Sequence, residues 1–170
     1  MYFIQQAAQA GSPGAFAHLL NAARGGDTEA MLHVGDCLYL GNGTKQDIAL
    51  AMHWYMTAAQ AGSGKAMLRL AEAYSSGEHI ETDRNTALHW YAAAERSGDL
   101  DARFQYAELF RIGNLVPADL DMAVRWHIKA AEAGHPRSEA FLRDLAATAD
   151  VPASTRALAA DCLRKRTPQD

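Results

Sequence analysis

The stretch SGKAMLRLAEAYSSGEHIETDRNTALHWYAAAERSG, residues 63–98, is one copy of a pattern that repeats along most of the chain. The copies before and after it carry the same residue types 36 positions away. Self-similarity at one fixed period, without gaps, predicts a repeat architecture. The clearest matching columns are Gly26, Gly62, Gly98 and Gly134; Ala30, Ala66 and Ala102, with Ser138 in the fourth place; and Trp54-Tyr55, Trp90-Tyr91 and Trp126-His127.

Each copy is predicted to contain two helices. In residues 27–62, Ala30, Val34 and Leu38 follow one another at intervals of four, which places them on one apolar helical face. Asp27 is expected to cap the start of this helix, and glycine at position 41 is expected to end it. A second helix follows Asp47. Its buried stripe is expected to contain small and aromatic residues, namely Ala51, Trp54, Tyr55, Ala58 and Ala59.

Stacked hairpins of this kind predict an all-α fold, a right-handed α-α superhelix (solenoid) of about five helical hairpins. The handedness is expected by analogy with other helical-hairpin solenoids. We expect an N-terminal capping pair of helices in residues 1–26, with helices near 2–10 and 15–25, then repeats at 27–62, 63–98 and 99–134, and a degenerate terminal repeat at 135–170. In that last repeat, Thr155 occupies the column of the capping aspartate and Cys162 that of the tryptophan.

The composition supports this prediction and excludes several protein classes. Alanine, the best helix former, occurs 35 times among 170 residues. The formal net charge of −4 argues against a dedicated nucleic-acid binder, and no apolar run approaches the roughly 20 residues of a membrane span. Only Cys37 and Cys162 are present, which excludes a disulfide-rich scaffold. The N-terminal residues lack the pattern of a signal peptide, so a cytoplasmic chain is expected.

The repeated motif resembles the Sel1-like repeat, a relative of the tetratricopeptide repeat. The residues that carry the resemblance in one copy, with equivalents 36 positions either side, are Ala66, Leu70, Ala71, Tyr74, Gly77, Asp83, Ala87, Trp90, Tyr91, Ala94 and Gly98. The resemblance implies a bacterial adaptor that scaffolds protein complexes in signalling, secretion or envelope-stress pathways. The Gly-x-Gly-Val loop typical of the family survives only at residues 41–44. The cysteine pairs of its secreted members are absent, which favours a reducing compartment.

The candidate partner-binding residues are those on the first helix of each copy that face away from the apolar stripe. Solenoids of this class usually turn these helices toward the concave surface. One position on these helices is acidic in all four copies, and we call it the acidic column: Asp36, Glu72, Glu108 and Asp144. It could be an acidic ladder that docks a basic or amphipathic segment, or a solvated face with local pairs such as Arg69 with Glu72. The candidates are His33, Asp36 and Leu40; Arg69 and Glu72; Gln105, Glu108 and Ile112; and Phe141 and Asp144.

Other chemistry-bearing residues have simpler explanations. Asp47, Asp83 and Asp119 recur at helix starts, as capping residues do. His53 and His89 have no partner at a recognised ligand spacing, and the two cysteines have no base indicated beside them. Residues 62–65, Gly-Ser-Gly-Lys, mimic a phosphate-binding loop but follow a helix and lack the Ser or Thr after the lysine. We therefore predict no catalytic residue, no cofactor and no metal.

The leading hypothesis is a non-enzymatic protein–protein interaction module that binds a protein or peptide partner on its concave surface, with no nucleic acid, membrane or metal involved. One alternative is an immunity-type or regulatory protein that neutralises a cognate secreted toxin or enzyme, a role of some proteins with similar repeats. A second alternative is a hydrolase, as suggested for some cysteine-rich relatives. The sequence shows no combination of nucleophile, base and oxyanion hole for that reaction.

Overall fold

The computed structural model describes residues 7–8 and 11–166. Residues 11–166 form nine helices and contain no strand, so the chain is an all-α repeat fold, as predicted. The helix predicted near residues 2–10 lies outside the described residues except at positions 7 and 8, which are helical. The helices are α2 (Pro13–Arg24), α3 (Thr28–Leu40), α4 (Ile48–Gln60), α5 (Gly64–Ser76), α6 (Arg84–Arg96), α7 (Leu100–Ile112), α8 (Leu120–Glu132), α9 (Pro136–Ala147) and α10 (Ala153–Arg166).

The helices begin and end where the sequence predicted. The carboxylate of Asp27 accepts the backbone N–H of Ala30 at 2.9 Å, and that of Asp47 accepts the N–H of Leu50 at 2.9 Å. These bonds satisfy amides that have no partner within the helix. At the other end of α3, Gly41 adopts the left-handed conformation with φ 76°, which a side chain would disfavour. Gly77 and Gly113 end α5 and α7 in the same way.

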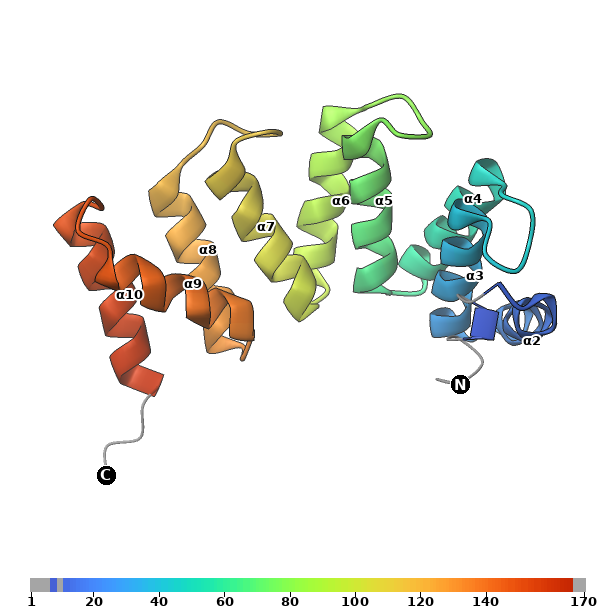
Figure 1. Cartoon of the computed structure of the whole chain (residues 1–170), viewed down its shortest axis with the longest axis horizontal. Helices are drawn as coiled ribbons and strands as arrows, with labels where there is room; N and C mark the ends of the chain where they lie inside the picture. Colours follow the sequence, from blue (N-terminus) through green and yellow to red (C-terminus); the bar gives the residue numbers. More distant parts are fainter. Residues whose placement is uncertain (1–6, 9–10, 167–170) are drawn as a thin grey trace. The chain divides into compact units, whose positions relative to one another are not determined.

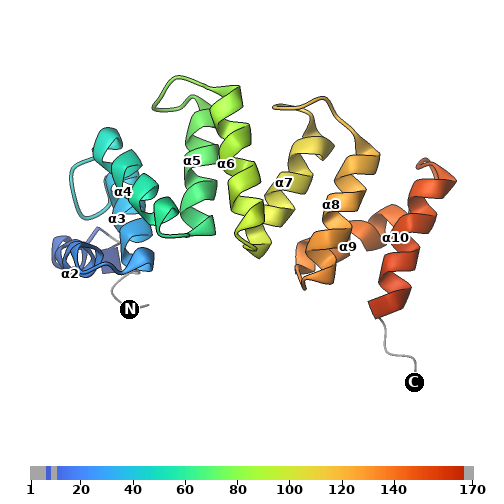
Figure 2. The ribbon, with the colours of Figure 1, turned by 180° about the vertical axis from the view of Figure 1, so that it is seen from behind.

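The first compact unit spans Met1–Ser97 and contains α2 to α6. Its helices form hairpins, and α5 and α6 run side by side in both views (Figure 1, Figure 2). The core mixes alanines with larger side chains such as Leu19, Val34, Tyr55 and Leu70, each at most 2% exposed. Trp54 and Trp90 pack against this core, as predicted for their column.

The second compact unit spans Gly98–Asp170 and contains α7 to α10. Val124, Leu142 and Cys162 are among the residues of its buried core. α10 begins at Ala153, directly after Val151-Pro152, so Thr155, which occupies the column of the capping aspartate, lies in the first turn of the helix and not at its cap. The buried Thr155 hydroxyl instead donates a 2.9 Å hydrogen bond to Asp121, which joins α10 to α8.

Candidate functional site

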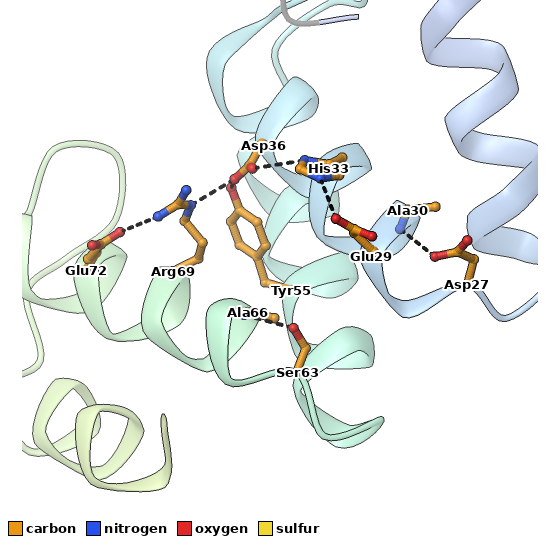
Figure 3. A network of polar contacts seen from close by, with 10 residues as sticks. All are labelled: Asp27, Glu29, Ala30, His33, Asp36, Tyr55, Ser63, Ala66, Arg69 and Glu72. Atoms are coloured by element: carbon orange, nitrogen blue, oxygen red, sulfur yellow. Dashed lines mark hydrogen bonds and ion pairs between the residues drawn. The ribbon is translucent and has the colours of Figure 1, made fainter. Parts of the chain in front are cut away.

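A hydrogen-bonded cluster joins α3, α4 and α5 within the first unit (Figure 3). Asp36 accepts the Tyr55 hydroxyl at 2.9 Å and the Nε of Arg69 at 3.0 Å. Arg69 reaches across from α5 and also donates to Glu72 at 3.1 Å. Two residues of the predicted acidic column thus share one guanidinium, and the predicted local pair between Arg69 and Glu72 is present.

The sequence places a glycine where this cluster needs close approach. A Cβ at position 35 would lie 2.5 Å from Cε1 of Tyr55, so only glycine lets the ring pack against α3. The ring is 2% exposed and its hydroxyl extends to Asp36 on the next position of α3. Because of this packing, the side chain of Asp36 is only 14% exposed rather than solvated.

Electrostatics keep the Asp36 carboxylate ionised. Burial by itself raises its pKa, but neighbouring His33, Arg69 and the Tyr55 hydroxyl together hold that pKa below its usual value. Burial and the Asp36 charge raise the pKa of Tyr55, so the phenol stays protonated and donates. Asp36 therefore acts as an internal counter-ion for Arg69, and its charge is largely satisfied inside the protein.

A groove lies beside this cluster, with a volume of about 480 Å³. We call it the α3–α5 groove. Leu40 lines this groove, and its exposed fraction of 63% is the highest among the large apolar side chains that the structure describes. Three carboxylates and one guanidinium line the groove, which gives a net formal charge of about −2. The lining residues are Asp36, Cys37, Tyr39, Leu40, Asn42, Tyr55, Arg69, Glu72, Ala73, Ser76 and Glu78.

In the second unit, Glu108 of the acidic column has different neighbours from those of Asp36. Glu108 accepts from Arg111 one turn along α7 and contacts Nε2 of His127 at 3.1 Å. Burial alone would raise the pKa of Glu108, but Arg111 and His127 lower it by more, so the pKa lies below its usual value. The charge of Glu108 is already balanced within the protein, like that of Asp36.

His127 begins a buried hydrogen-bond network that sequence reasoning missed. Its Nδ1 lies 3.2 Å from the hydroxyl of Ser138, and Ser138 also donates its backbone N–H to Nδ1 of His135 at 3.2 Å. Nε2 of His135 contacts Asp101 at 3.3 Å. Carboxylates only accept, so each histidine carries its proton on Nε2 and accepts through Nδ1. Every polar group in the network then has a partner with both histidines neutral.

The network resembles the parts of a nucleophilic centre but is closed to substrate. A serine beside a histidine that is held by a carboxylate is the arrangement used for acyl transfer. Ser138 and His127 are both 0% exposed, so no substrate reaches the hydroxyl. The contacts are those of a satisfied polar core, in which buried groups find partners.

The remaining candidate residues are more dispersed. His33 is half-buried beside Glu29 and Asp36. Ile112 is 57% exposed, Gln105 is half-buried and Asp144 is exposed. Phe141 packs its ring 4.1 Å from that of His127 and is part of the core packing. Of the ten candidates, the groove therefore brings together four, which are Asp36, Leu40, Arg69 and Glu72.

The predicted capping residue Asp83, the segment that mimics a phosphate loop and the two cysteines have structural roles. Asp83 accepts the N–H of Thr86 at the start of α6, and Ser63 caps α5 within the segment that mimics a phosphate loop. Cys37 and Cys162 are buried free thiols. Across the described residues, no three histidine, cysteine, aspartate or glutamate side chains come together as metal ligands. None of the helices described between residues 11 and 166 combines the length and apolar character that a membrane crossing requires.

A second groove lies between α8 and α10, again unpredicted from the sequence. Its volume is about 410 Å³. Trp126 forms part of it, and the ammonium of Lys129 sits 3.7 Å from the centre of the indole. We call it the α8–α10 groove. It is lined by Met122, Arg125, Trp126, Ile128, Lys129 and Leu158.

Solved structures similar to this chain share its repeat architecture. A Sel1 repeat protein from Oxalobacter formigenes matches with a TM-score of 0.71 and 24% identity, over 91% of this chain and 65% of that one. A protective antigen present in uropathogenic Escherichia coli strains, which displays an SLR fold, matches with a TM-score of 0.69 and 23% identity, over 91% of this chain and 34% of that one. The chain thus spans about two thirds and one third of their lengths. No curated protein matches the sequence.

The family comparison covers most of the chain. The model of the Sel1 repeat matches residues 28–63, 64–99 and 100–135 in tandem. These are the three copies in which the first helices, α3, α5 and α7, begin 36 residues apart. The chain therefore belongs to the Sel1 repeat family, whose repeats generally mediate protein–protein interactions and serve as non-catalytic scaffolds.

Proposed function

We propose that this chain is a non-enzymatic adaptor that binds a segment of a partner protein in the α3–α5 groove. The observation that carries the proposal is the groove itself, because it combines an exposed leucine with an excess of negative charge. Large exposed apolar side chains beside a concavity are typical of interaction sites. The proposed partner segment places an apolar side chain against Leu40 and a lysine or arginine near the carboxylates.

The contacts within the groove indicate which carboxylates are available to a partner. Asp36 is held by Arg69 and Tyr55, and Glu72 shares the same guanidinium. Glu78 lies in the loop after α5 with 69% of its side chain exposed, and its nearest ionic neighbour is His79 at 3.9 Å. A cationic side chain would thus first meet the carboxylate of Glu78 and the Glu72 oxygen that does not accept from Arg69.

The same reasoning makes the groove a better candidate than the whole acidic column. Glu108 already has two partners in its own unit, and Phe141 is engaged with His127. We therefore assign the recognition to the first unit.

A matched pair of charge reversals tests the proposal. Glu78→Lys changes a residue that lines the groove, whereas Glu81→Lys makes the same change in the same loop outside it. Each variant and the wild type would select binders from a displayed library of random peptides. We expect that peptides which bind the wild type and Glu81→Lys but not Glu78→Lys are enriched in Lys or Arg beside large apolar residues, because opposite charges steer and orient binding.

Two outcomes would contradict the proposal. One is that no selected peptide depends on Glu78. The other is that the dependent peptides show no excess of basic residues. Circular dichroism of both variants should match that of the wild type, because Glu78 and Glu81 lie outside the helices.

A further inference from the structure

The α8–α10 groove has the opposite charge character to the α3–α5 groove. Among the residues that the structure describes, its only charged lining residues are Arg125 and Lys129, which give a net formal charge of about +2. The other lining residues are apolar, and two of them, Met122 and Leu158, are 37% and 39% exposed. An apolar floor flanked by two cations and no carboxylate is complementary to an acidic, apolar ligand.

Carboxylates close to the groove are already engaged. Asp121 accepts the hydroxyl of Thr155 at 2.9 Å, and Asp161 on α10 is held by Lys165 at 2.7 Å. The Thr155 hydroxyl is neutral and leaves the charge of Asp121 in place, but neither carboxylate is within ion-pair distance of Arg125 in the part of the chain that the structure describes. Both cations lie one helical turn apart on α8, so a bound carboxylate could contact the two together.

The indole of Trp126 gives the groove a rigid aromatic wall. Its ring packs nearly perpendicular to that of Tyr106 of α7, at a centroid distance of 4.8 Å, which restrains its orientation. Lys129 covers one part of the ring at 3.7 Å. A half-buried tryptophan beside cations is the type of side chain that dominates protein interfaces, since it supplies large contact area at small entropic cost.

We propose that the α8–α10 groove is a second docking site, which binds an acidic and apolar peptide segment of a partner protein. Such a segment places a leucine, isoleucine or phenylalanine against Met122, Trp126 and Leu158. Its aspartate or glutamate pairs with Arg125 and Lys129. This site goes beyond the proposed function, because it lies in the other unit and selects the opposite charge.

The charge count favours a peptide over a membrane surface. Attraction to anionic lipid takes clusters of about four to eight basic residues, each worth about 1 kcal/mol. The groove supplies two. Its volume of about 410 Å³ lies within the range of clefts that bind small ligands or a few side chains.

The test combines peptide selection with a spectroscopic reporter on Trp126. A displayed random peptide library is selected on the wild type, on Arg125→Glu and on Arg143→Glu. Arg143 is the matched control, since it is an exposed arginine of the same unit whose contact with Glu139 is a surface ion pair of small energetic value. We expect the peptides lost from Arg125→Glu alone to be enriched in Asp or Glu next to large apolar residues.

A synthetic peptide from that set is then titrated into protein labelled with 5-fluorotryptophan. The chain has three tryptophans, so fluorine NMR gives three resonances, and Trp126→Phe identifies the one that belongs to position 126. We expect the peptide to shift the Trp126 resonance and to bind Arg125→Glu roughly tenfold more weakly. A basic peptide selected through Glu78 should leave that resonance unchanged, which separates this site from the α3–α5 groove.

Four results would overturn the proposal. Peptides that depend on Arg125 could lack acidic residues, or the acidic peptide could bind without moving the Trp126 resonance. Alternatively, the same resonance could respond to vesicles with anionic lipid, or to protein concentration in step with sedimentation of a dimer. The last two results would assign the groove to a membrane and to a second copy of this chain, respectively.

Discussion

The buried His127 network makes the protein sensitive to acid. Burial lowers the pKa of His127 to about 4, and this outweighs the opposing attraction of Glu108. Arg111 and His135, which also face the ring, lower it further. In the unfolded chain the same imidazole titrates near 6.5, its usual value. Between these two pH values the unfolded state binds a proton that the folded state does not.

The sign and size of the effect follow from linkage. Because the unfolded chain binds more protons below pH 6.5, the free energy of unfolding falls as the pH is lowered from about 6.5 to 4. The full difference is about 3 kcal/mol, of which about 2 kcal/mol is lost by pH 5. Above pH 7 both states are neutral at this position, so His127 contributes no pH dependence there.

A variant that restores the residues of the other repeats isolates this contribution. The columns of His127 and Ser138 hold Tyr55 and Ala66 in the first unit, so His127→Tyr combined with Ser138→Ala reproduces that pattern. Urea unfolding of wild type and double variant, followed by circular dichroism, is measured from pH 7.5 to 4.5. All other titrating groups are common to both proteins.

We expect the difference in unfolding free energy between the two proteins to change by about 2 kcal/mol between pH 7 and pH 5, in favour of the variant at pH 5. Hydrogen exchange should place the loss in α8 and α9, with the helices of the first unit as internal controls. A difference that stays constant over this pH range would refute the reasoning, since it would mean that His127 binds protons equally in both states.

Three further predictions concern the cluster around Asp36. A change from glycine to alanine inside a helix normally stabilises it by about 1 kcal/mol, but in Gly35→Ala the new Cβ would meet the ring of Tyr55. We therefore expect thermal and urea unfolding to show a loss of about 1–3 kcal/mol in the free energy of unfolding. An increase in stability would show that the ring moves aside at no cost. Tyr55→Phe removes a hydrogen bond to the charged Asp36, so we expect the free energy of unfolding to fall by about 2 kcal/mol in the same assay. An unchanged stability would contradict this. Burial, with the nearby Asp36 charge, raises the pKa of Cys37 to about 11, so iodoacetamide at pH 7.5 should label it only in urea, as read by mass spectrometry; rapid labelling of the native protein would disagree.

The fold could be predicted from the sequence because its causes are local and repeated. Aspartates at helix starts and glycines at helix ends act within a few residues, and each recurs every 36 positions. The period therefore fixes the bounds of α3 to α9. The period does not fix the start of α10, because Thr155, in the capping column, lies in the first turn and its hydroxyl donates to Asp121 of α8.

The candidate site could be predicted only in part, because it depends on which side chains meet across helices. The acidic column was visible, but not that Arg69 bridges Asp36 and Glu72, nor that Gly35 draws Tyr55 onto Asp36. The buried network left a signal that was not used. Three columns change together at His127, His135 and Ser138, and Ser138 contacts both histidines. The α8–α10 groove left none, since Leu158 belongs to the degenerate terminal repeat.

The central claim is that a partner protein docks in the α3–α5 groove, and photo-crosslinking tests it most directly. A benzoylphenylalanine is placed at Leu40, which lines the groove, or at Leu50, which is exposed on α4 outside it. In cells that produce the protein, irradiation should yield a crosslinked product from position 40 that disappears when Glu78→Lys is added, and none from position 50. Equal products from both positions, or a product from position 40 that is indifferent to Glu78→Lys, would contradict the account.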